Sequence, residues 1–177
     1  MENERASILA CRQGDPAAFE TLYRAYAPSM MRTARRILRS EQDAEDALQQ
    51  AFLKLHRGIG NFDFKAKFST YVYRIMMNVC LDMIDKRKRQ VEQTPIEDSP
   101  EPGVAPRGLL RMKLSQAIGT LPERMRAAFV LFAVEGLGQQ EIAEIMGTGV
   151  GAVKAQIFQA KVRLRVLLAE NKQEAAS

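Results

Sequence analysis

The chain has few of the side chains that metal sites and most active sites use. It contains one histidine, His56, two cysteines, Cys11 and Cys80, and no tryptophan. His56 has neither a second histidine nor a nearby cysteine to complete a metal site, and no glycine-rich phosphate-binding loop occurs. The sequence therefore predicts no metal, no cofactor and no catalytic residue, and an enzyme is the weakest hypothesis.

Long apolar runs are absent as well. No stretch reaches the roughly 18 consecutive apolar residues of a membrane span, and the acidic start MENERASILACRQGD lacks the apolar core of a signal peptide. Two cysteines are too few for a disulfide framework and suit a reducing compartment. We expect a cytoplasmic protein with no direct membrane insertion.

The net charge of +5 is spread unevenly along the chain. Residues 1–90 carry about +5, residues 91–110 about −3 and residues 111–177 about +3. Prolines and acidic side chains gather in the middle segment, EQTPIEDSPEPGVAPRG, which has little to bury. The sequence predicts two basic domains, residues 1–90 and 109–177, joined by a flexible acidic linker over residues 91–108.

Apolar residues recur with the helical period almost everywhere, and no alternating strand pattern is convincing. We therefore predict an all-α fold of two small helical domains. Asp15 is expected to cap a helix that has Pro16 in its first position. The expected helices span residues 15–26, 28–39, 42–58, 68–88, 109–119, 122–135, 138–146 and 150–170.

The segment DAEDALQQAFLKLHR, residues 43–57, has two different faces. Its apolar stripe comprises Ala44, Ala47, Leu48, Ala51, Phe52 and Leu55. The opposite face presents Asp46, Gln49, Gln50 and Leu53 at helical spacing, a pattern that fits docking against another helix. A solvated face with one stray leucine explains the pattern equally well.

Residues 61–89, NFDFKAKFSTYVYRIMMNVCLDMIDKRKR, combine aromatic and cationic side chains. Aromatic rings stack on unpaired bases while cations follow the phosphates, a combination typical of single-stranded nucleic-acid binding. The alternative places the rings in the core and lets residues 86–89 complement a helix C-terminus. We prefer the core for Phe68 and Tyr73, and nucleic-acid binding for Tyr71, which shares a helix face with Lys67, Arg74 and Asn78.

The segments QQEIAEIMGTG and VGAVKAQIFQAKVRL indicate a helix, a glycine turn and a second helix, whose apolar stripe is Val153, Ile157, Ala160 and Leu164. This layout is typical of a helix-turn-helix, whose second helix enters the DNA major groove, although a plain helical hairpin shares it. The outward face of the second helix carries few charges for a DNA-binding helix.

Four blocks together resemble one family: DAEDALQQAFLKLHR, FKAKFSTYVYRIMMN, LPERMRAAFVLFAVEGLGQQEIAEIMG and VGAVKAQIFQAKVRLR. They are similar to the bacterial extracytoplasmic-function (ECF) sigma factors, alternative sigma factors of RNA polymerase. The resemblance covers residues 15–169 in the family's order, with a linker in the expected place. It implies that the first half corresponds to the family's second conserved region and the second half to its fourth.

The resemblance also implies three sets of contact residues. The clamp helices of the largest polymerase subunit would bind Asp43, Asp46, Gln49, Gln50 and Leu53. The −10 element would be recognised and melted, with one base flipped into the loop 61–67, by Phe62, Phe64, Lys65, Lys67, Tyr71, Arg74, Asn78, Lys86 and Arg87. The −35 element would be read by Lys154, Ala155, Gln156, Gln159, Lys161 and Arg163. Further expected partners are the polymerase flap and an anti-sigma factor that clamps both halves.

Some positions depart from the family pattern. Tyr71 stands where tryptophan is usual and Gln50 where glutamate is usual, while Ala155, Gln156 and Gln159 replace basic and hydroxyl residues. Because glutamine prefers adenine where arginine reads guanine, we expect an atypical −35 sequence, bound weakly and with little salt dependence.

Two other functions stay open: a stand-alone dimeric helix-turn-helix regulator, and a degenerate sigma-like interaction adaptor.

Overall fold

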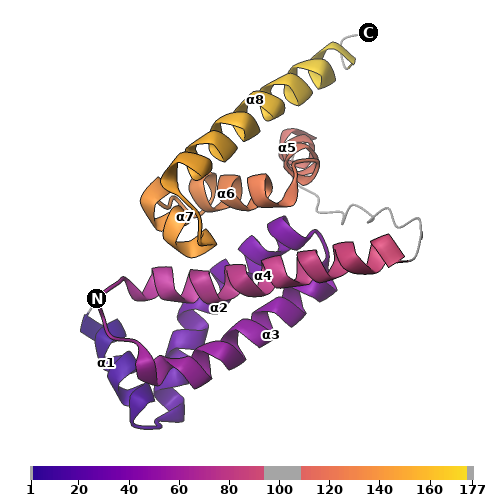
Figure 1. The fold of residues 1–177 in the computed structure, drawn as a ribbon. Helices are drawn as coiled ribbons and strands as arrows, with labels where there is room; N and C mark the ends of the chain where they lie inside the picture. The colour runs from indigo at the N-terminus through magenta and orange to yellow at the C-terminus, as the bar shows by residue number, and fades with distance from the viewer. Residues whose placement is uncertain (1, 94–108, 175–177) are drawn as a thin grey trace.

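A computed structural model describes residues 2–93 and 109–174, and the side chains of residues 4–89 and 113–169. Within these residues the chain is helical and contains no strand, so the predicted all-α class is confirmed (Figure 1). The elements are α1 (Glu2–Arg12), α2 (Pro16–Leu38), α3 (Glu41–Gly58), the 3-10 helix η1 (Ile59–Asn61), α4 (Phe68–Gln93), α5 (Leu109–Gly119), α6 (Glu123–Ala133), α7 (Gln139–Met146) and α8 (Val150–Glu174).

Helix α2 is continuous where the sequence predicted two helices, so that prediction was wrong. Asp15 caps it as expected, with Oδ1 accepting from the backbone N–H of Ala17 at 2.9 Å, and Pro16 occupies the first turn. Pro28 lies inside the helix on its exposed side. The carbonyl of Arg24, which loses its N–H partner there, is on the same exposed side, where water can reach it.

Helices α2, α3 and α4 form the core of the first half, and α1 covers one end of it (Figure 1). The apolar stripe predicted on α3 is buried at all six positions. On α4, Phe68 and Tyr73 are 3% and 6% exposed, which confirms that both belong to the core. Helix α1 was not predicted, because Ile8 is its one fully buried apolar side chain among the described residues and gives no periodic signal.

In the second half, α7 and α8 form the predicted helix-turn-helix geometry. Gly147 ends α7 in the left-handed conformation, with φ +61°, and α8 begins at Val150. The stripe of Val153, Ile157, Ala160 and Leu164 is buried as expected. Arg126 of α6, also buried, donates from Nη1 to the carbonyls of Gly119 and Leu121 and so holds the end of α5.

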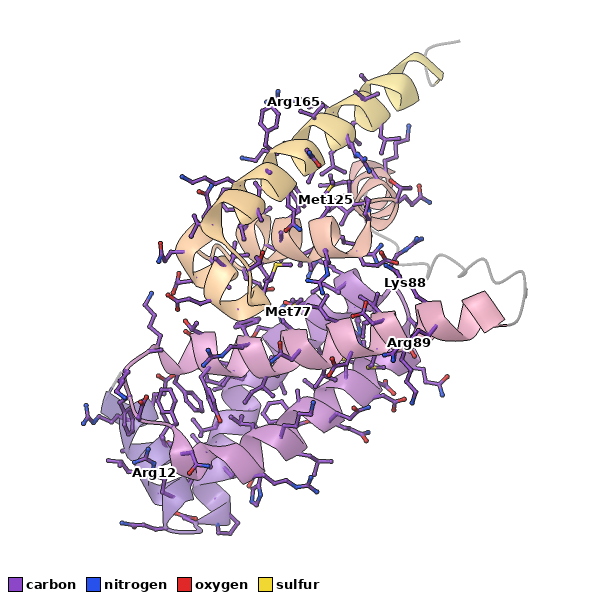
Figure 2. The ribbon with its side chains drawn as sticks, in the orientation of Figure 1. Arg12, Met77, Lys88, Arg89, Met125 and Arg165 are labelled. Carbon is purple, nitrogen blue, oxygen red and sulfur yellow. The ribbon has the colours of Figure 1, made fainter. Side chains whose placement is uncertain are left out.

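The two halves pack directly against each other. Helix α4 contacts α7, while α2 contacts α5 and α6, and the buried residues of both halves form one apolar cluster. Met77 lies fully buried between α4 and the second half (Figure 2). Glu135, after α6, accepts hydrogen bonds from Thr33 Oγ1 and, at 2.6 Å, from Tyr73 Oη. The sequence did not predict this contact, because local periodicity does not specify how two linked domains meet.

Helix α4 continues to Gln93, three residues into the predicted linker, and residues 94–108 of that linker lie outside the described residues. Helix α5 begins at Leu109, where the second domain was expected to start. No helix in the described part of the chain is long and apolar enough to cross a bilayer.

Candidate nucleic-acid interface

The polar face of α3 is exposed as the spacing predicted. Asp46, Gln49 and Gln50 face solvent, and Leu53 is 58% exposed, well above what a core leucine has. Asp43 differs from these residues, because it is partly buried and forms an ion pair with Arg87 of α4. This ion pair joins one residue predicted to bind polymerase to one predicted to bind DNA.

The loop before α4 is lined by a cluster of aromatic rings. The ring of Phe62 lies 5.0 Å from Phe64, 5.2 Å from Phe68 and 5.1 Å from Tyr71, centroid to centroid. Phe62 and Phe68 are buried, whereas Phe64 and Tyr71 remain partly exposed. The buried Phe62 therefore packs beneath the rings of Phe64 and Tyr71 on the core side of the cluster. Phe64 and Tyr71 are the rings that a ligand can contact.

Tyr71 shares an accessible surface with Arg74 and Asn78, as the helical spacing predicted. Burial raises the pKa of the Tyr71 phenol, while the nearby Arg74 charge opposes that shift. Arg74 and Asn78 are exposed. The surface thus offers a stacking ring, a fixed positive charge and an amide that can hydrogen-bond a base edge.

The lysines and arginine predicted around this surface have different surroundings. Lys65 Nζ lies 2.8 Å from Asp63, and hydrogen bonding from Lys65 lowers the pKa of the Asp63 carboxyl. Lys67 Nζ lies 2.9 Å from Glu141 of α7, in the other half of the molecule. Lys86 is exposed, and Arg87 is held by Asp43. The structure therefore places Lys67 and Arg87 in ion pairs that DNA would have to replace.

The outward face of α8 is only partly as predicted. Lys154, Ala155, Gln159 and Arg163 are exposed. Gln156 is half-buried with its Oε1 inaccessible and without a partner, and Lys161 Nζ lies 4.7 Å above the ring of Phe132 in α6. Phe158, which is 68% exposed on the same helix, was not predicted as a contact residue. The signal that could have identified it is a phenylalanine outside the apolar stripe of α8, between the predicted contact positions Gln156 and Gln159.

Neither cysteine has the surroundings of a nucleophile, because burial raises the pKa of both thiols, that of Cys80 to about 12. His56 lies on an exposed helix surface against Phe19. In the described part of the chain no group of His, Cys, Asp and Glu side chains could hold a metal ion.

Comparison with known proteins settles the family. Residues 22–90 match Sigma-70 region 2, and residues 111–164 match Sigma-70 region 4. The ECF RNA polymerase sigma factor SigM of Mycobacterium tuberculosis is 34% identical over 169 residues, covering 94% of this chain and 86% of the relative. The chain belongs to the ECF sigma factors. It is therefore a transcription initiation factor and not an enzyme.

Two solved structures share its fold. The sigma factor RpoE of Bartonella quintana, solved with the anti-sigma factor NepR, matches with a TM-score of 0.77 at 21% identity, over 85% of this chain and 96% of that one. CnrH, solved with the cytosolic domain of CnrY, matches with a TM-score of 0.71 at 25% identity, over 95% of this chain and 98% of that one. Both matches extend over the two halves of this sigma factor, so it shares its overall fold with these two proteins.

Proposed function

We propose that this ECF sigma factor binds core RNA polymerase through α3, opens the −10 element with the loop 61–67 and α4, and reads the −35 element with α8. The observation that carries the proposal is the surface of Tyr71, Arg74 and Asn78. It joins a stacking ring to a cation and an amide, and it lies on the same molecule as a helix-turn-helix. A regulator that used the helix-turn-helix alone would have no use for it.

The polymerase contact is supported by the exposed face of Asp46, Gln49, Gln50 and Leu53. We propose that this face docks on the clamp helices of the largest subunit and that the second half contacts the flap. We place the protein in the cytoplasm, where polymerase and promoter DNA occur. An anti-sigma factor that holds the two halves together is a further proposed partner, by analogy with the anti-sigma partner of the Bartonella protein.

Reconstituted transcription with core polymerase across a genomic fragment library tests the proposal. We expect co-elution with the core enzyme and transcripts that start at a limited set of promoters. Leu53→Ala should weaken co-elution without loss of folding, because Leu53 is exposed, and Glu45→Ala on the same helix is the matched control. Tight binding to a palindromic site without polymerase would instead indicate a stand-alone regulator, and co-elution without transcripts an interaction adaptor.

Reading of the −35 element is proposed for Lys154, Gln159 and the exposed Phe158, whose ring can contact a thymine methyl group. We expect Gln159→Ala to change the preferred −35 sequence of the holoenzyme, whereas Gln156→Ala should change it little because Oε1 of Gln156 is inaccessible. Selection of −35 sequences from a randomised promoter pool measures both. Unaltered selection by Gln159→Ala would remove this residue from the reading set and leave Lys154 and Phe158 as the readers.

A further inference from the structure

Helix α1 covers the loop that precedes α4, although it lies before residue 22, where the match to Sigma-70 region 2 begins. Its position is fixed at two points. Ile8 is 1% exposed, and Tyr26 Oη of α2 donates to Glu4 Oε2 at 2.5 Å. Helix α1 also packs against η1, the short helix that leads into the loop.

Helix α1 contacts the loop at the side chain of Phe64. The guanidinium carbon of Arg5 lies 4.9 Å from the centre of the Phe64 ring, and that of Arg12 lies 5.0 Å from it (Arg12 is labelled in Figure 2). The same ring packs against Phe62 in the aromatic cluster. One loop side chain is therefore held by two cations of α1 and by a ring of its own cluster.

The backbone of Phe64, whose ring the two arginines contact, has an unusual conformation. Its φ is +61°, in the left-handed region that a residue with a Cβ rarely adopts. Among the described residues, Arg39 is the other non-glycine residue with positive φ, and it lies at a helix C-terminus, where this conformation is common. Phe64 lies in a loop, where the contacts that can hold this conformation include those of its ring and a local hydrogen bond from the Lys65 backbone N–H to Asp63 Oδ1 at 3.1 Å.

We propose that Arg5 and Arg12 are positioning residues for promoter opening, which hold Phe64 and thereby fix the loop that receives unpaired −10 bases. The inference rests on the proposed role of the loop 61–67. Both arginines are exposed, so their N–H groups remain available to phosphates of the unpaired strand while the guanidinium groups cover the ring. Helix α1 therefore belongs to the surface that binds single-stranded DNA.

The test compares four holoenzymes on a promoter that carries 2-aminopurine in its −10 element. Arg5→Gln with Arg12→Gln should slow opening about fivefold, the effect expected when two exposed cation–π contacts are lost. Arg5→Lys with Arg12→Lys keeps the cations and should restore most of the rate. Arg24→Gln with Arg32→Gln removes the same charge from exposed positions on α2 and should leave opening unchanged. Co-elution with core polymerase checks that each variant is folded.

A Phe64→Leu background distinguishes positioning of the loop from simple loss of charge. Leucine keeps an apolar side chain but has no aromatic face, so the glutamine pair should cause little further slowing in that background. Equal slowing in both backgrounds, or wild-type opening by the glutamine pair, would overturn the inference. Failure of the wild-type holoenzyme to open any promoter would instead count against the proposed function itself.

Discussion

A glycine at the end of α3 determines where the ring of Tyr71 can lie. A Cβ placed on Gly58 would come within 2.6 Å of Tyr71 Oη, closer than van der Waals contact allows. Gly58→Ala should therefore displace the Tyr71 ring, which packs against Phe62, with little effect on folding because the clash is at the tip of one side chain. If the proposed role of Tyr71 is correct, this variant opens promoters more slowly, as 2-aminopurine fluorescence in the −10 element would measure.

Gly60 is the matched control for this substitution. A Cβ at Gly60 meets nothing within 4 Å, so Gly60→Ala should open promoters at the wild-type rate. Thermal denaturation of both variants checks that folding is preserved. If Gly58→Ala also opens promoters at the wild-type rate, the position of the Tyr71 ring does not limit opening.

Exposure of single residues was predictable where it follows from the position of a side chain on its own helix. Asp46, Gln49 and Leu53 are exposed because the opposite stripe of α3 is buried. The predictions failed where a neighbouring element decides the surroundings. Phe62 is covered by other rings and Lys161 lies over a ring of α6, and neither contact can be derived from periodicity.

The turn between α7 and α8 depends on the conformation of Gly147. Its φ of +61° is accessible to glycine at little cost, whereas alanine should destabilise the turn by about 1 kcal/mol. Gly151, in the first turn of α8, has no such φ and has open space around it, so Gly151→Ala should be neutral or slightly stabilising. Urea denaturation followed by circular dichroism measures the difference, and equal midpoints for the two variants would contradict this account of the turn.

Whole helices were predictable from sequence when their buried face is long and regular. The span of α3 and the two helices around the glycine turn are close to their predicted limits. Helix α2 was divided in error at Pro28. The proline removes one backbone hydrogen bond, but the Arg24 carbonyl that loses it is on the exposed side of the helix, and α2 continues past it. Helix α1 was missed, since it is held by contacts with Tyr26 and Phe64 that are distant in the sequence.

At the scale of the whole molecule, the contact between the halves combines apolar burial with ion pairs at its edge. Lys67 pairs with Glu141 at 2.9 Å, and Lys88 pairs with Glu123 at 3.1 Å. The hydrogen bond from Lys67 lowers the pKa of the Glu141 carboxyl. Burial would raise the pKa of Glu123, but hydrogen bonds from the backbone and from Lys88 lower it overall.

Acid should therefore weaken the contact between the halves. A carboxylate whose pKa is lowered by folding stabilises the folded state above its ordinary value, here 4.5, and loses that contribution as the pH falls through the lowered value. Both pairs are solvent-accessible, so each contributes at most about 1 kcal/mol. We expect the radius of gyration from small-angle X-ray scattering to increase below about pH 4.5. The increase should be smaller in the double variant Glu123→Gln with Glu141→Gln, which has already lost both ion pairs. In this variant the amide oxygen at position 141 can still accept the hydrogen bond from the backbone N–H of Gly138. An identical acid response in this variant and the wild type would assign the effect to other groups, and an unchanged radius down to about pH 3 would indicate that the apolar contact alone holds the halves together.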